Sequence, residues 1–103
     1  MNKEELEEER VNAFVRWFVG WYKKSEEFKD IEDKIRERNL AGYTYIEIKI
    51  KYTEDQPSVR LDSGLFLDCL KDEFPDFNFS RKQITKKGCP MVAGGVMISI
   101  IWG

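Results

Sequence analysis

Residues 43–52 alternate between two kinds of side chain, and this alternation constrains the fold more than any other feature of the chain. One side of a strand would carry Thr44, Ile46, Ile48, Ile50 and Tyr52, and the other side Tyr43, Tyr45, Glu47, Lys49 and Lys51. A period of two with one apolar side is typical of a β-strand that covers a core with one face and meets water with the other. The sequence therefore predicts a half-buried strand over 43–52.

Two helical segments are predicted before this strand. Residues 3–24 begin with a run of glutamates, where the helix dipole favours negative charge. The apolar arc of residues 11–22 is about 200° wide, more than the ~100° stripe that a surface helix needs. This helix is therefore either central to the core or buries a second face against a partner. Ser25 can cap a second helix over 26–38, and the sequence leaves open whether the two helices are continuous.

The remaining elements lie in the C-terminal half. A helix over 64–74 is predicted between Ser63, or Asp62, as its cap and Pro75 as its end. The sequence Ser80-Arg81-Lys82-Gln83 matches the S-x-x-Q capping box, which predicts a short helix over 81–87. Strands over 90–93 and 96–102 are expected around a tight turn at Gly94-Gly95. The prediction is one α+β domain, residues 1–103: an acidic helical segment at 3–38, then a long strand, two helices and a β-hairpin in 43–103, with a three-stranded antiparallel sheet.

Residues 61–103 show a resemblance to a known family. It rests on Leu65-Phe66-Leu67-Asp68-Cys69-Leu70, on Phe77-Asn78-Phe79-Ser80-Arg81-Lys82-Gln83-Ile84 and on Trp102-Gly103. This part of the chain resembles winged helix-turn-helix domains at the ends of viral and mobile-element replication proteins. The resemblance implies a recognition helix at 81–87, a wing at 89–102 and a third strand at 43–52. The chain departs from that pattern because its first strand is long and its wing tip has no Lys or Arg. In the rival α+β arrangement, 81–87 is a plain connection.

Charge is unevenly divided along the chain. The net charge is −2, yet no acidic residue lies between Phe77 and Gly103. Nucleic-acid-binding proteins are often basic overall, so any contact here would depend on a local patch. The predicted contacts to duplex nucleic acid are Arg81, Lys82, Gln83, Lys86 and Lys87, because such side chains bind phosphates and base edges. The alternative is that they form the solvated face of a short helix.

A second function is compatible with the same sequence. The wide apolar arc of 11–22 and the acidic balance fit a protein-binding inhibitor or adaptor of viral or mobile-element origin. Its predicted interface is Trp17, Trp21 and Tyr22, because Trp and Tyr are enriched at interface hot spots. The partner would be another protein or a second copy of the chain. The same aromatic residues can instead belong to the core, which we favour for Trp17.

Catalysis is not expected, and neither is a cofactor. The chain has no His, so it lacks a conventional Ser-His or Cys-His pair, and Gly94-Gly95 does not form a phosphate-binding loop. Cys69 and Cys89 cannot complete a zinc site, and we expect both to be reduced thiols. The Glu47-Ile48-Lys49 triplet matches an element of metal-dependent nucleases, but charge pairing across a sheet explains it equally well. Without a signal peptide or a membrane-length apolar run, we expect a cytoplasmic protein, or one of a host cell's cytosol or nucleus.

Overall fold

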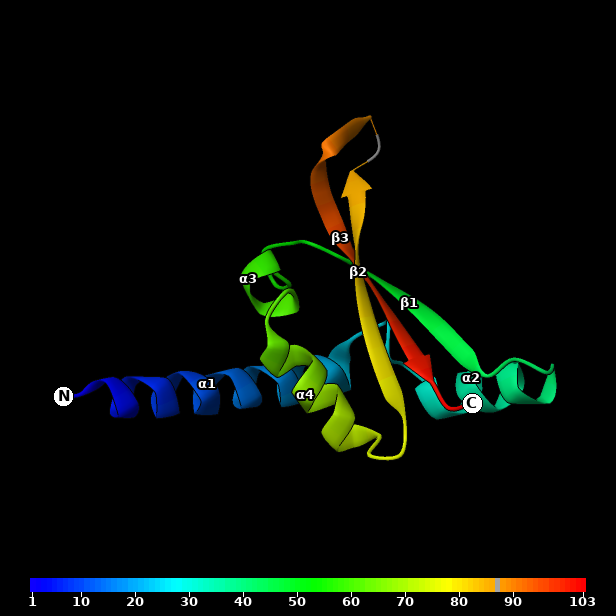
Figure 1. Ribbon diagram of the computed structural model, residues 1–103, viewed down its shortest axis with the longest axis horizontal. Coiled ribbons are helices and arrows are strands. Elements are labelled where there is room, and N and C mark those ends of the chain that lie inside the picture. The colour runs from blue at the N-terminus through cyan, green and yellow to red at the C-terminus, as the bar shows by residue number, and fades with distance from the viewer. Residues whose placement is uncertain (87) are drawn as a thin grey trace.

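Four helices and three strands make up the computed structural model, which describes residues 1–86 and 88–103 and the side chains of these residues except 86 and 89–93. In chain order the elements are α1 (Lys3–Lys24), α2 (Ile31–Leu40), β1 (Tyr45–Lys51), α3 (Ser58–Leu61), α4 (Gly64–Glu73), β2 (Asn78–Lys86) and β3 (Cys89–Ile101) (Figure 1). Within these residues, no helix combines the length and the apolar character that crossing a bilayer requires.

Short polar side chains set the helix boundaries. Asn2 Oδ1 accepts a hydrogen bond from the Glu5 backbone at 2.9 Å and caps α1. Ser25 ends α1 in an extended conformation, and its Oγ accepts from the Phe28 backbone at 3.3 Å. The next helix starts only at Ile31, after Asp30 in a left-handed conformation with φ of 55°. The helices before β1 are therefore separate.

Ser63 caps α4 as predicted, with Oγ 3.2 Å from the Leu65 nitrogen.

The sheet is antiparallel with strand order β1-β3-β2, so the C-terminal strand is central. β1 confirms the strand predicted over 43–52, and its faces alternate as expected: Ile48 and Ile50 are buried, while Glu47 and Lys49 are exposed. The α+β class and the three-stranded antiparallel sheet are thus as the sequence predicts.

The core lies between the helices and one face of the sheet. From the helices, Phe18 of α1 packs edge-on against Phe66 of α4, with ring centroids 5.8 Å apart. From the sheet, the inward side chains of the central strand are fully buried, including Ile98 and Ile100. One sheet face is therefore covered, and the alternate residues of each strand are left on the opposite face.

The helix predicted over 81–87 is wrong, because residues 78–86 form the edge strand β2. Apolar alternation is weak there for two physical reasons. Arg81 points to the covered face but is satisfied by backbone carbonyl groups, and Gln83 lies far enough along the strand to be exposed. An edge strand that extends beyond the packed core does not need an apolar residue at every inward position. The predicted recognition helix is absent for this reason.

The turn predicted at Gly94-Gly95 is also wrong, since both glycines lie inside β3. The chain instead reverses between Lys86 and Cys89, where Gly88 has φ of +83°. Gly95 has a different role: a Cβ there would collide with the Ile50 carbonyl oxygen and lie 3.1 Å from Lys51 Cα. The far end of the β2–β3 hairpin extends past β1 and projects away from the helices (Figure 1).

Candidate functional site: the open face of the sheet

The sheet face opposite the core is exposed, and we call it the open face. Strand pairing arranges its side chains in four rows, each with one residue from β1, one from β3 and one from β2. The rows are Tyr45–Ile101–Asn78, Glu47–Ser99–Ser80, Lys49–Met97–Lys82 and Lys51–Gly95–Ile84. All four β1 residues are exposed, as are Asn78, Ser80 and Lys82. This face is therefore accessible to a ligand along its whole length.

Lysines dominate the charge of the open face. Lys49 and Lys82 flank Met97 in one row, and two strand spacings place their Cα atoms about 10 Å apart. Lys51 follows in the next row, and Glu47 is the single acidic residue among the twelve. Of the chain's 19 acidic residues, only Glu47 belongs to a strand. The open face is thus locally positive in a chain of net charge −2.

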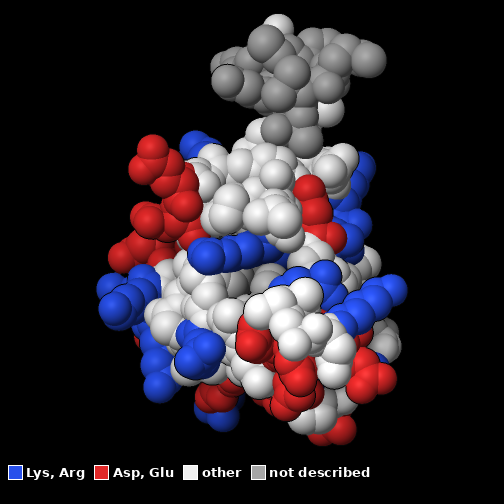
Figure 2. All heavy atoms as spheres, turned by 90° about the vertical axis from the view of Figure 1, so that its left-hand side faces the viewer, with Lys and Arg blue, Asp and Glu red and all other residues white. Residues whose placement is uncertain are grey.

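The side of the molecule at which α1 begins has a different charge distribution from the open face. Acidic and basic side chains alternate there, without a continuous field of one sign (Figure 2).

Aromatic rings and an arginine lie at one end of the open face. The Arg38 guanidinium carbon is 3.7 Å from the centre of the Tyr43 ring and 5.3 Å from that of Tyr45. Arg38 Nε also donates to the Tyr45 carbonyl oxygen at 3.2 Å. The two tyrosine rings meet edge to face, with centroids 6.1 Å apart. α2 therefore holds a positively charged aromatic cluster at the edge of β1.

Arg81, a predicted nucleic-acid contact, is instead a structural residue. Its Nη1 donates to the carbonyl oxygens of Leu61 at 3.2 Å and Ser63 at 3.1 Å. Close by, the Tyr52 hydroxyl donates to Asp62 Oδ1 at 2.8 Å. These bonds join the junction of α3 and α4 to the covered face of the sheet. Arg81 is therefore directed inward, away from the open face.

The other predicted nucleic-acid contacts are divided between the two faces. Lys82 lies on the open face, whereas Gln83 pairs with Val96 and shares the face of Arg81. Lys86 is the last residue of β2, and its side chain is not described. Lys87 lies outside the described residues. Lys82 is thus the one predicted contact that the described side chains place among the lysines of β1.

Tyr45, Lys49, Lys51 and Arg38 were not predicted as site residues. The first three were recognised as the wet side of a strand, but nothing in the sequence indicated which strand would lie beside β1. A strand order of β1-β3-β2 brings residues 49 and 82 into one row although they are 33 positions apart in the sequence. The available signal was that the solvent-facing side of β1 carries Lys49 and Lys51, and that the segment from Phe77 to Gly103 has basic but no acidic residues.

The predicted protein interface is mostly internal. Trp21 is 9% exposed and packs against Phe28 and Phe66, which corrects the expectation that it faces a partner. In the amide orientation that satisfies both groups, Gln56 accepts from Trp21 Nε1 and donates to the Lys51 carbonyl oxygen at 3.1 Å.

The other two predicted interface residues are partly buried. Burial, with smaller contributions from Glu73 and Glu32, raises the pKa of Tyr22 to about 12. Trp17 remains half-buried, and the Arg60 guanidinium carbon lies 4.8 Å from its ring centre. Of the three residues, only Trp17 and part of Tyr22 can meet a partner.

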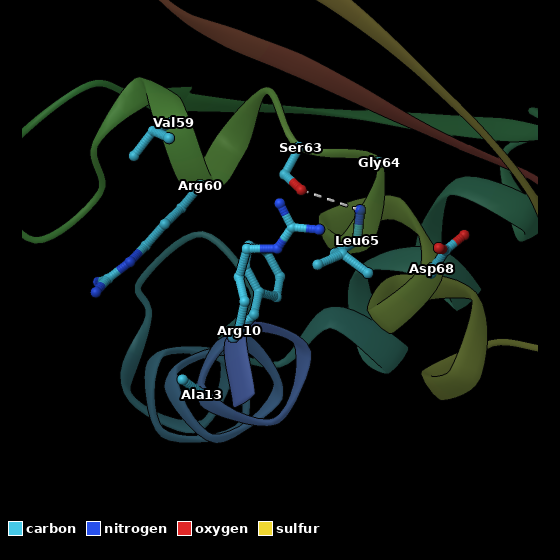
Figure 3. Close-up of a pocket in the computed structure, with 9 residues that line it drawn as sticks. Arg10, Ala13, Val59, Arg60, Ser63, Gly64, Leu65 and Asp68 are labelled. Atoms are coloured by element: carbon cyan, nitrogen blue, oxygen red, sulfur yellow. Dashed lines mark hydrogen bonds between the residues drawn. The ribbon is translucent and has the colours of Figure 1, made fainter. Parts of the chain in front are cut away.

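A groove lies between α1 and the α3–α4 junction. This groove has a volume of about 610 Å³, and Figure 3 shows Arg10 pointing from α1 toward Ser63 and the first turn of α4. Arg60 lies to one side and Asp68 to the other. Ser63 Oγ accepts a hydrogen bond from the Leu65 backbone N–H at the edge of this groove. The mixed charges and the apolar lining, which includes Phe14 and Val59, suit a protein surface better than a small anion.

Catalytic and metal-binding groups are scarce in the part of the chain that the structure describes. It contains no group of three or more Cys, Asp or Glu side chains placed to hold a metal ion. Cys69 is buried and free, and burial, together with Asp72, Asp68 and Glu73, raises the pKa of its thiol. A protonated buried thiol is a poor nucleophile. Glu47 is the single acidic residue in the four rows of the open face, so the nuclease interpretation of Glu47 and Lys49 gains no second carboxylate there.

Comparison with protein-family models, with curated proteins and with solved structures found no match to this chain. The geometry of the open face is therefore the basis on which a function can be proposed.

Proposed function

We propose that this chain is a small, non-enzymatic nucleic-acid-binding module that uses the open face of its sheet. The observation behind this proposal is the row Lys49–Met97–Lys82, with Lys51 beside it. Neutralisation of phosphates by Lys and Arg supplies most of the sequence-independent affinity of proteins for nucleic acid. A winged-helix mode of binding would need a helix at 81–87, where this chain has a strand. The sheet face takes the place of that helix in the proposal.

The proposal accounts for the negative net charge. Nearly all acidic residues belong to helices and loops, so phosphates on the open face approach three lysines and only Glu47. With about three phosphate contacts, the logarithm of the affinity should fall with the logarithm of salt concentration with a slope near −2 to −3. Binding should thus be weak at physiological salt and measurable at low salt.

A matched pair of charge reversals tests the proposal. Lys82→Glu changes the open face, and Lys71→Glu makes the same change in net charge at an exposed site on α4. Fluorescence anisotropy of a labelled oligonucleotide at low salt measures the affinity of both variants. We expect Lys82→Glu to weaken binding by about fivefold to tenfold and to lower the salt slope by nearly one, because a phosphate contact is lost. Lys71→Glu should have a much smaller effect. Equal effects of the two reversals, or no binding by the parent protein, would contradict the proposal.

A protein-binding inhibitor or adaptor is the second candidate, and one observation favours it. Val59 of α3 is 77% exposed and lines the groove with Phe14 and Arg60, and the Arg60 guanidinium carbon lies 4.8 Å from the centre of the Trp17 ring. Arg and Trp are enriched at interface hot spots, and an exposed valine beside them adds apolar area. If a second copy fills this groove, sedimentation equilibrium should show a dimer that Val59→Asp dissociates. A monomer at all concentrations would remove the self-association form of this candidate.

A further inference from the structure

We infer that the open face binds single-stranded rather than duplex nucleic acid, with unpaired bases stacked at the Tyr45 end and phosphates on the lysines. This inference rests on the proposed function and assigns the class of ligand and a base-binding site. Its geometric basis is the separation of two chemistries along one face. Tyr45 and Ile101 share the first row, and the lysines occupy the third and fourth rows.

The first row offers a surface for a flat ring. Tyr45 is 38% exposed, Tyr43 is 45% exposed, and Ile101 is partly exposed beside Tyr45 in the sheet. A nucleic-acid base can stack on a tyrosine ring whatever its sequence, because every base has a π-face. In a duplex these faces are covered by the neighbouring base pairs, so stacking on a protein side chain favours an unpaired strand.

Arg38 contacts both tyrosines and makes this aromatic surface positive. Its guanidinium lies 3.7 Å from the centre of the Tyr43 ring, while its Nε is anchored on the Tyr45 carbonyl oxygen. The arginine thus covers one side of Tyr43 and adds a positive charge next to Tyr45. Arginine contributes to single-strand binding in this way, by attraction to phosphates and by stacking.

The spacing of the rows suits a single nucleic-acid strand that runs along the open face. Lys49 lies four residues after Tyr45 on β1, a distance of about 13 Å, and Lys82 lies across Met97 from Lys49. A base at the first row therefore leaves its chain free to continue over Ser99 and Ser80 to the lysines. Both serines carry hydroxyl groups that can bond to sugars or base edges. Glu47 in the second row is the one residue that opposes a phosphate there.

The test, on the unmodified protein, compares a single strand with an abasic oligomer that has the same number of phosphates and with a duplex that has about twice as many. The probes are an oligothymidylate of about ten nucleotides, within the ~4–16 that small β domains cover, an abasic oligomer of equal length and a duplex of equal length. An oligouridylate is included to compare RNA with DNA. Competition at low salt should show the oligothymidylate binding at least about fivefold more tightly than the abasic oligomer, since stacking is worth ~1–3 kcal/mol per base. It should also outcompete the duplex.

Variants of Tyr45 then locate the base-binding site. Tyr45→Ala should bring the ratio of oligothymidylate to abasic affinity close to one, and Tyr45→Phe, which keeps the ring, should preserve the ratio. If the oligothymidylate and the abasic oligomer bound equally well while Lys82→Glu still weakened binding, the inference would be overturned but the proposed function would stand. Tighter binding of the duplex than of the single strand would also overturn it. Failure of every probe to bind would remove the proposed function itself.

Discussion

Arg81 Nη1 lies 3.1 Å from the carbonyl oxygen of Ser63, and this hydrogen bond ties an edge strand of the sheet to the residue that caps α4. The same nitrogen donates to the Leu61 carbonyl oxygen at the end of α3. Arg81, a basic residue of the C-terminal segment, thus bonds to the backbone at the α3–α4 junction. Its neighbour Lys82 points to the opposite face and is exposed.

We predict that Arg81→Ala lowers the free energy of unfolding by about 1–3 kcal/mol, because two partly buried carbonyl groups lose a charged donor. Urea denaturation followed by circular dichroism measures the change. Lys82→Ala is the control, and it should stay within about 0.5 kcal/mol of the parent as an exposed substitution. The reverse order of the two effects would show that Arg81 does not anchor the α3–α4 junction.

The close approach of β3 to β1 gives a second prediction, for Gly95→Ala. The added Cβ would collide with the Ile50 carbonyl oxygen, and backbone atoms of a paired strand cannot move away as a side chain can. We expect a loss of about 1–3 kcal/mol in unfolding free energy, in the range of overpacked sites. Differential scanning calorimetry measures the accompanying fall in Tm.

Gly20→Ala is the matched control, with the opposite sign. Gly20 lies inside α1, and a Cβ there would meet no atom within 4 Å. Alanine has a higher helix propensity than glycine, so this variant should gain about 0.8–1 kcal/mol. If both variants changed stability in the same direction, the space around Gly95 would not be the cause of its effect.

Glu47 allows a prediction of gained affinity. It is the single acidic residue on the open face and pairs with Ser99 in the row next to Lys49 and Lys82. Glu47→Gln removes its repulsion of a bound phosphate, worth about 0.6 kcal/mol at ~7 Å in water. Affinity at low salt should rise about twofold to threefold. Anisotropy titration checks this, and an unchanged or lower affinity would indicate that phosphates do not pass over this row.

Stability at alkaline pH should depend on Tyr22. Burial raises the pKa of Tyr22 to about 12 in the folded protein, above its ordinary value of 10.0. Between these values the folded protein keeps a proton that the unfolded chain has released, so the free energy of unfolding falls as pH rises. The contribution is intact below pH ~10. Urea denaturation at increasing alkaline pH should show a smaller fall for Tyr22→Phe than for the parent. The same fall in both would show that another group is responsible.

Sequence patterns predicted those elements whose side chains are sorted by burial. Residues 3–24 form α1 as predicted, and the alternation over 43–52 is β1, because each of these elements has one face in the core. The segment 81–87 was predicted wrongly because β2 lies at an edge and its inward Arg81 is satisfied by carbonyl groups rather than by apolar contacts. Local capping chemistry at Ser80 and Gln83 matched a helix, but hydrogen bonding to β3 decided the conformation.

The sequence by itself determined the α+β class, the covered face of β1 and the basic, acid-free character of the segment from Phe77 to Gly103. Local periodicity and composition are properties of neighbouring residues, and they need no knowledge of distant contacts. Only the tertiary structure decided that Lys49 and Lys82 share a row, that Arg81 turns inward and that Arg38 meets Tyr45. These relationships depend on which strand pairs with which and in what register, and strand pairing is set by the packing of the whole core.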